Sequence, residues 1–135
     1  ALVTGQKETG RDNLAERNTR KTGCEKESET AAYLAKKGFV ILERNFSCRQ
    51  GEIDIIGMDG PYLVFLEVKY RSSREFDNPL AAVDKRKQQK ICRAADYYRY
   101  KMQIPSDTPV RYDVVGILGK ETVWIRNAFP HMHKR

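Results

Sequence analysis

The stretch that most limits the fold runs from Gly51 to Lys69 and reads GEIDIIGMDGPYLVFLEVK. Two apolar runs flank the residues MDGP, a combination typical of a turn, so the stretch predicts a β-hairpin. Side chains of a strand point alternately to the two faces of a sheet. One face of the hairpin should therefore carry an apolar stripe, made by Ile53, Ile55, Val64, Leu66 and Val68. A stripe of this kind must be buried, and we expect a helix against it.

The opposite face of the hairpin begins apolar and ends ionic. Glu52 and Asp54 lie on its first strand, and Glu67 and Lys69 lie on its second strand. A four-residue loop, residues 59–62, places Asp54 opposite Glu67. The same register places Glu52 opposite Lys69.

Two acidic residues opposite each other create an electrostatic conflict that the fold has to resolve. Like charges directly opposite on a sheet are destabilising. Asp54 and Glu67 therefore need a cation between them, a shared proton or a raised pKa. A divalent metal ion with carboxylate ligands meets this need most simply. The alternative is a surface hairpin with an ordinary ion pair between Glu67 and Lys69.

Length and charge limit the class of protein. The chain has 135 residues, which fits one domain with its own core, and a net charge of +7. This excess of basic residues predicts a polyanionic partner, nucleic acid before an anionic membrane surface. No apolar run reaches the roughly 18 residues that span a bilayer, so no membrane partner is expected. The three scattered cysteines predict free thiols and a cytoplasmic protein.

The pattern along the chain predicts an α/β domain between two end segments. Residues 1–24 are polar and read as a flexible arm, residues 25–129 form the domain, and residues 130–135 form a tail with a frayed end. The expected elements are a helix at 25–37, a strand at 39–46, the hairpin, a helix at 79–101 capped by Asn78, and strands at 111–118 and 121–125. The order α-β-β-β-α-β-β indicates a mixed sheet with helices on its faces.

The second helix carries a basic surface that could follow a phosphate backbone. The predicted nucleic-acid-binding residues are Lys85, Arg86, Lys87, Lys90 and Arg93. Binding by such a surface falls steeply with salt. Lys87 lies within the apolar stripe of the helix, so it is either a lysine whose stem covers the core or a cation near a reacting phosphate. For the other residues the alternative is a solvated helix face.

Two acidic residues outside the hairpin are further candidates. Glu27 shares a helical face with Ala31 and Leu34, which places an acid at the edge of a buried stripe. The alternative is a solvated glutamate in the first helical turn. Asp113, on a predicted strand, is either structural or close to the site.

The ionic positions of the hairpin resemble a known signature. Asp54, followed on the adjoining strand by Glu67-Val68-Lys69, is similar to the PD-(D/E)xK pattern of the restriction-endonuclease-like superfamily. More narrowly, residues 25–129 resemble the YraN-like family of uncharacterised bacterial proteins. The matching stretches are AAYLAKKGFVILERNF, GEIDIIGMDG, LVFLEVKYRSS, AVDKRKQQKICRAADYY, RYDVVGIL and RNAF. The family implies a core of helix, three strands, helix and strand.

The resemblance implies a metal site on the hairpin. Asp54 and Glu67 would hold Mg²⁺ or Mn²⁺ with the backbone carbonyl of Val68. Lys69 would orient the attacking water. Glu52 would tune Lys69 or the metal ion without contacting it.

A second likeness extends this site to the N-terminal helix. The chain is also similar to archaeal Holliday-junction resolvases, whose N-terminal helix carries an active-site glutamate. Glu27 aligns best with that residue, and Glu25 and Glu29 lie within a turn of it.

These observations lead to one leading hypothesis and two alternatives. The leading hypothesis is a metal-dependent endonuclease that acts on DNA, including branched or damaged DNA, in DNA processing or repair. Resolvases of this fold are dimers, so a homodimer is an expectation as well. The alternatives are a nucleic-acid-binding module that does not cut and an interaction scaffold with a nuclease-like fold. The first is favoured because the ionic hairpin positions are intact.

Overall fold

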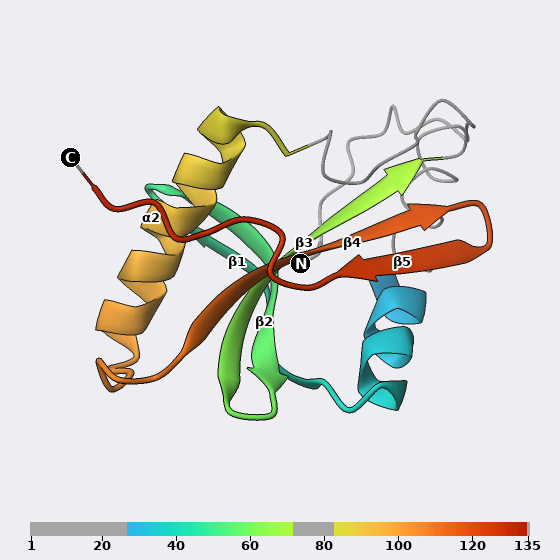
Figure 1. The fold of residues 1–135 in the computed structure, drawn as a ribbon, viewed down its shortest axis with the longest axis horizontal. Coiled ribbons are helices and arrows are strands. Elements are labelled where there is room, and N and C mark those ends of the chain that lie inside the picture. Colours follow the sequence, from blue (N-terminus) through green and yellow to red (C-terminus); the bar gives the residue numbers. More distant parts are fainter. Residues whose placement is uncertain (1–26, 72–82, 135) are drawn as a thin grey trace, which may run out of the picture.

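The computed structural model describes residues 27–71 and 83–134, and it shows a mixed sheet with a helix on each face (Figure 1). The N-terminal arm predicted at residues 1–24 lies outside the described residues. The elements are a helix that covers residues 27–36, β1 (Val40–Cys48), β2 (Gly51–Asp59), β3 (Tyr62–Arg71), α2 (Lys85–Lys101), β4 (Val110–Leu118) and β5 (Glu121–Ile125). The predicted fold class and element order are confirmed.

The five strands lie in the order β1-β2-β3-β4-β5. Neighbouring strands are antiparallel except β3 and β4, which are parallel. Parallel neighbours cannot be joined by a tight turn, so the chain crosses over through α2 between them. In Figure 1 α2 covers one face of the sheet, and the helix of residues 27–36 lies on the other side. Among the described residues, no helix has the length and apolar character needed to span a membrane.

The hairpin has the predicted register but a shorter loop. Met58 pairs with Leu63, as expected, and Asp59 pairs with Tyr62. The loop therefore contains two residues, Gly60 and Pro61, rather than four. Gly60 has a φ of +62°, a conformation that glycine adopts without a steric penalty.

Two hydrophobic cores lie on the two faces of the sheet. Leu34 of the N-terminal helix packs with Ile55, Val64 and Leu66, so the predicted stripe is covered by a helix as expected. The placement of Ile53 on that stripe is wrong, because Ile53 lies in the core beneath α2. Regular alternation would place Ile53 and Ile55 on the same face. The alternation of β2 therefore breaks between them, at Asp54.

The break coincides with a fork in the sheet. The pairing of β2 with β3 ends at Ile55 and Leu66. Beyond this point β2 stays with β1 as far as the pair of Gly51 and Cys48. β3 instead continues along β4. Figure 1 shows the two pairs of strands running apart from the middle of the sheet. We call this place the β2–β3 fork.

Close packing at Gly51 positions α2 beside the fork. A Cβ atom on Gly51 would lie 3.2 Å from the backbone oxygen of Lys90, tighter than most real contacts. The absence of a side chain there lets the helix backbone approach the end of β2.

The second helix begins later than predicted. Residues Val83 and Asp84 are not helical, and Asp84 is the N-cap of α2, with its side chain accepting a hydrogen bond from the backbone N–H of Lys87. Asn78 and Pro79, the predicted start, lie outside the described residues. The later start places Lys87 in the first turn of the helix.

His131 and Met132, near the end of the chain, pack against the domain rather than fraying. The imidazole of His131 stacks on the Tyr112 ring, and its Nδ1 lies 2.7 Å from the Tyr112 hydroxyl. The backbone N–H of Met132 donates to the sulfur of Cys92 in α2. The expectation of a frayed end is therefore wrong for this segment, because buried aromatic and sulfur groups of the core bind it.

Candidate active site

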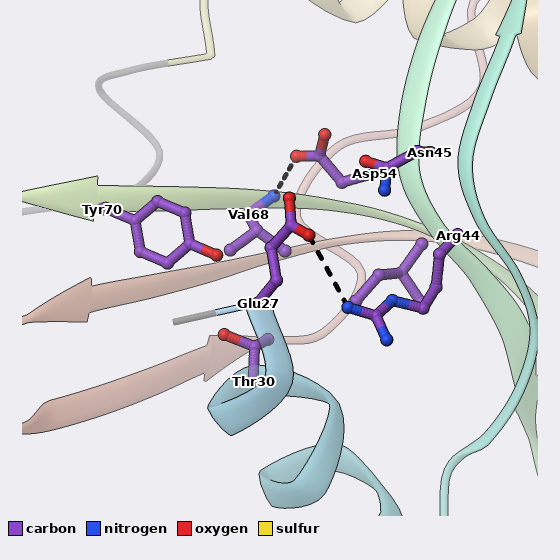
Figure 2. Close-up of a pocket in the computed structure, with 8 residues that line it drawn as sticks. Glu27, Thr30, Arg44, Asn45, Asp54, Val68 and Tyr70 are labelled. Atoms are coloured by element: carbon purple, nitrogen blue, oxygen red, sulfur yellow. Dashed lines mark hydrogen bonds and ion pairs between the residues drawn. The ribbon is translucent and has the colours of Figure 1, made fainter. Parts of the chain in front are cut away.

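Asp54 lies at the β2–β3 fork and bridges it. Its Oδ2 accepts a hydrogen bond of 2.8 Å from the backbone N–H of Val68 on β3 (Figure 2). The separation of the strands removes the ladder partner of this N–H, and an unpaired buried N–H is costly. The carboxylate of Asp54 takes the place of the missing backbone acceptor.

The environment of Asp54 favours its neutral form. Burial, followed by the negative charge of Glu67, raises the pKa of Asp54 from 3.8 to about 7. The N–H of Val68 and the ammonium groups of Lys87 and Lys69 act in the opposite direction but do not offset these effects. Near neutral pH Asp54 is therefore partly protonated, and a bound cation would favour its ionised form.

Glu67 is buried, with 5% of its surface exposed, and it carries two lysines on one oxygen. Its Oε2 lies 2.9 Å from Nζ of Lys87 and 3.3 Å from Nζ of Lys69. The contact with Glu67 raises the pKa of Lys87, so the ammonium form is strongly favoured. Two acidic and two basic groups, from β2, β3 and α2, therefore meet at the fork.

Glu52 was predicted to join this cluster opposite Lys69, but it lies outside it. The β2–β3 ladder ends before it, so Glu52 is not the cross-strand partner of Lys69. It pairs instead with Ser47 on β1, and its side chain is exposed. The register was extended past the point where the strands separate.

A pocket of about 100 Å³ opens on the side of the fork that faces the N-terminal helix. Glu27, Thr30, Arg44, Asn45, Asp54 and Tyr70 are among the residues that line it (Figure 2). Glu27 comes from the first described turn of the helix, and its Oε1 lies 3.6 Å from the guanidinium of Arg44. Glu29, the neighbouring alternative, is exposed. Asp54 thus borders both the pocket and the lysine cluster.

The sequence interpretation missed Arg44 and Asn45, because the run FVILERNF reads as a plain strand. Asn45 has a φ of +55°, which asparagine tolerates better than most residues. Phe46 lies in the core beneath α2, whereas Arg44 lines the pocket on the other face. An asparagine inside an otherwise regular strand pattern was the signal that could have indicated the turn of the chain.

The predicted nucleic-acid-binding residues fall into two groups. Lys85, Arg86 and Lys90 are exposed on α2. Lys87 is bound to Glu67, and Arg93 contacts the carboxylate of Asp96 at 3.2 Å and the backbone carbonyl of Met132. The exposed group remains available to a partner, whereas Arg93 holds the C-terminal segment.

Asp113 has a structural role. It is 1% exposed, and its oxygens accept hydrogen bonds from the guanidinium of Arg111, the indole of Trp124 and the backbone N–H of Asn127. Arg111 in turn binds Asp59 at 2.7 Å. This network joins β4, β5 and the end of β2.

The donor set at the fork fits a hard divalent ion with few protein ligands. In residues 27–71 and 83–134, no three His, Cys, Asp or Glu side chains converge as a ready metal site. Asp54 and Glu67 offer two carboxylates, and Val68 adds a backbone carbonyl. Mg²⁺ usually binds through one or two carboxylates and keeps several waters, which matches this set.

Sequence comparisons show which known proteins the chain resembles. The model of the Uncharacterised protein family UPF0102 matches residues 26–117. A UPF0102 protein of Lachnoclostridium phytofermentans is 46% identical over 112 residues, which cover 83% of this chain and 95% of that protein. One of Legionella pneumophila is 42% identical over 99 residues, covering 72% and 84%. One of Fusobacterium nucleatum is 41% identical over 110 residues, covering 82% and 92%.

Proposed function

The chain belongs to the Uncharacterised protein family UPF0102, as its resemblance to the YraN-like family predicted, and we propose that it is a Mg²⁺- or Mn²⁺-dependent endonuclease acting on DNA. Branched or damaged DNA is the proposed substrate, in DNA processing or repair. The observation that supports this best is that Asp54 reaches across the β2–β3 fork to the backbone N–H of Val68, the residue next to Glu67, where the charge of Glu67 acts on it. The lysines beside Glu67 supply the cations that such chemistry needs.

The acidic groups of the fork would hold the metal ion. Asp54 and Glu67 are the ligands, together with the carbonyl of Val68, and Glu27 completes the set directly or through a water. When bound, the ion supplies Lewis acidity toward the phosphate and lowers the pKa of its water. The raised pKa of Asp54 fits this role, because a nearby cation is what its ionised form lacks.

The basic groups would act on the water and the phosphate. Lys69 orients the attacking water toward the phosphorus atom. Lys87 stabilises the negative charge that grows on the phosphate oxygens as the bond to the leaving oxygen breaks. Hydrolysis leaves a 5′-phosphate and a 3′-hydroxyl.

The exposed basic residues of α2 would follow the DNA backbone. Lys85, Arg86 and Lys90 lie in the same turns of the helix as Lys87, which contacts Glu67 at the fork. A strand bound along these residues therefore leads to the carboxylates. Each phosphate contact contributes to a salt-dependent affinity.

Cutting both strands of a duplex requires two sites, so we also propose a homodimer, which analytical ultracentrifugation tests.

The proposal is tested by cleavage of labelled flap, junction and duplex DNA with Mg²⁺ or Mn²⁺. Asp54→Asn and Lys69→Ala should each abolish product. Asp107→Asn and Lys120→Ala are matched controls, because both residues are exposed and the substitutions remove the same charges away from the fork. Cleavage that survives Asp54→Asn and Lys69→Ala would reject the mechanism.

One observation favours the rival, a DNA-binding module that does not cut. Lys69 and Lys87 already compensate the charge of Glu67, so this carboxylate does not need a metal ion. This rival predicts salt-dependent DNA binding without metal-dependent product. Calorimetry with Mn²⁺ separates the two. The endonuclease predicts heat of metal binding that Asp54→Asn removes, whereas the rival requires no metal binding.

A further inference from the structure

The conformation of β1 directs Arg44 toward the fork. In β1 the register shifts between Ile41 and Glu43, and Asn45 adopts a φ of +55°. Bulges and left-handed residues in strands re-aim side chains and occur often next to functional sites. The result is that Arg44 lines the pocket while Phe46 is buried beneath α2. A regular strand would have placed the two side chains on one face.

The contact of Arg44 inside the pocket is weak enough to be exchanged. Its guanidinium lies 3.6 Å from Glu27, beyond hydrogen-bond distance, and the two side chains are 40% and 37% exposed. Exposed ion pairs of this kind are held loosely. A guanidinium is also a planar donor that binds phosphate oxygens in pairs.

Positive groups flank the carboxylate of Asp54 from both sides of the sheet. Lys69 and Lys87 approach from the side of Glu67, and Arg44 lies across the pocket that Asp54 also lines (Figure 2). The pocket, about 100 Å³ in volume, has room for several waters and therefore for a group the size of a phosphate.

We propose that Arg44 binds a backbone phosphate of the DNA substrate next to the one that is cut, and that Glu27 holds Arg44 in place until the DNA arrives. The proposal rests on the proposed function of the fork. On binding, the guanidinium exchanges the carboxylate of Glu27 for phosphate oxygens. Glu27 is thereby released to complete the proposed set of metal ligands. Arg44 is in this sense the third basic residue of the site, supplied by β1 instead of the hairpin or α2.

The test measures DNA binding without cleavage, by fluorescence anisotropy of labelled junction DNA in EDTA over a range of salt concentrations. Arg44→Gln should weaken binding about tenfold, the effect of losing one charge-assisted contact. It should also lower the slope of log affinity against log salt by about 0.9. Arg49→Gln, which removes an exposed arginine from the turn between β1 and β2, is the matched control and should have a much smaller effect.

Glu27→Gln separates phosphate binding from a role in anchoring the N-terminal helix. It breaks the same ion pair but leaves the guanidinium of Arg44 in place, so binding should be unchanged or tighter. If Glu27→Gln and Arg44→Gln weaken binding equally, Arg44 acts only through Glu27 and the inference is wrong. It is also wrong if Arg44→Gln behaves like Arg49→Gln.

The outcomes for the two proposals can be told apart. DNA binding that depends on Arg44, without any metal-dependent product, would reject the endonuclease and keep the phosphate contact. Cleavage that depends on Asp54 but is indifferent to Arg44→Gln would do the reverse. If the wild-type protein binds no DNA under any salt condition, both proposals fail.

Discussion

The Oδ2 atom of Asp54 lies 2.8 Å from the backbone nitrogen of Val68, across the gap where β2 leaves β3. A side chain therefore replaces the backbone acceptor that the sheet no longer supplies there. The same carboxylate feels the charge of Glu67 and borders the pocket that contains Arg44. One residue thus closes the fork structurally and connects the groups on its two sides.

Asn and Ala at position 54 should have different effects on stability. Asp54→Asn keeps an oxygen that can accept the N–H of Val68 and removes a buried charge, so the free energy of unfolding at pH 7 should stay equal or rise. Asp54→Ala leaves that N–H unpaired and should cost about 1–3 kcal/mol. Both should abolish Mn²⁺ binding. Urea denaturation and calorimetry measure the two effects, and equal stability of the two variants would contradict the role of the hydrogen bond.

The stability of the protein should depend on the protonation of Asp54. Its pKa is about 7 in the folded protein against 3.8 for an unperturbed aspartate. Between these values the folded state binds more protons than the unfolded state, so this group makes the free energy of unfolding fall as pH rises from about 4 to 7. Above pH 7 its effect is constant. Denaturation of the wild type and of Asp54→Asn across pH 5–8 isolates this contribution, and parallel profiles would contradict it.

Metal affinity should follow the same titration in the opposite direction. Because protonated Asp54 is a poor ligand, Mn²⁺ binding should strengthen as pH rises through about 7. Calorimetry at several pH values measures this, and an affinity that is constant between pH 6 and 8 would exclude Asp54 as the titrating ligand.

Lys87 should oppose metal binding while supporting catalysis. Its Nζ lies 2.9 Å from Oε2 of Glu67, one of the two carboxylates that would hold the metal ion. Lys87→Gln should raise Mn²⁺ affinity about fifteenfold, the effect of removing a unit charge ~5 Å from a divalent ion with water-like screening. DNA cleavage should fall. Lys90→Gln, a variant of an exposed lysine one turn along α2, controls for net charge, and equal metal affinities of the two variants would contradict the competition.

Asp113 should matter for folding and not for metal binding. Its buried carboxylate accepts hydrogen bonds from Arg111, Trp124 and Asn127. Asp113→Ala leaves the guanidinium of Arg111 short of a partner and should cost about 3–5 kcal/mol. Asp107→Ala removes an exposed acid and should change stability little. Folded Asp113→Ala should still bind Mn²⁺ with wild-type affinity, and a loss of affinity would place this residue in the site.

The sequence was sufficient where a local pattern decides the structure. The period of two in the hairpin and its turn determine that Met58 pairs with Leu63. Asp54 and Glu67 lie beyond the last β2–β3 pair, so they are not the cross-strand partners that the register predicted, and Asp54 reaches β3 through the N–H of Val68. The sequence failed where the outcome depends on several segments at once. Glu52 was placed opposite Lys69 because nothing in the alternation signals that the pairing of β2 with β3 ends at Ile55 and Leu66.

The start of α2 and the position of Arg44 failed for a similar reason. Asn78-Pro79 is a strong helix start, yet α2 begins only after Asp84, whose side chain accepts a hydrogen bond from the N–H of Lys87. Arg44 reaches the pocket only because Asn45 leaves the extended conformation. Asparagine tolerates the left-handed region and so gives a weak signal for it, but the tertiary structure around the residue decides whether that conformation forms.

The conformation of Asn45 offers a direct test of how Arg44 is directed. Asn45→Gly and Asn45→Ala both remove the amide from the pocket, but only glycine adopts a φ of +55° without strain. Asn45→Ala should therefore be about 1–2 kcal/mol less stable than Asn45→Gly, as measured by urea denaturation. If alanine relieves its strain by returning β1 to regular alternation, Arg44 leaves the pocket, and DNA binding in EDTA should weaken for Asn45→Ala and persist for Asn45→Gly. Equal stability and equal DNA binding of the two variants would show that the left-handed turn at Asn45 does not direct Arg44.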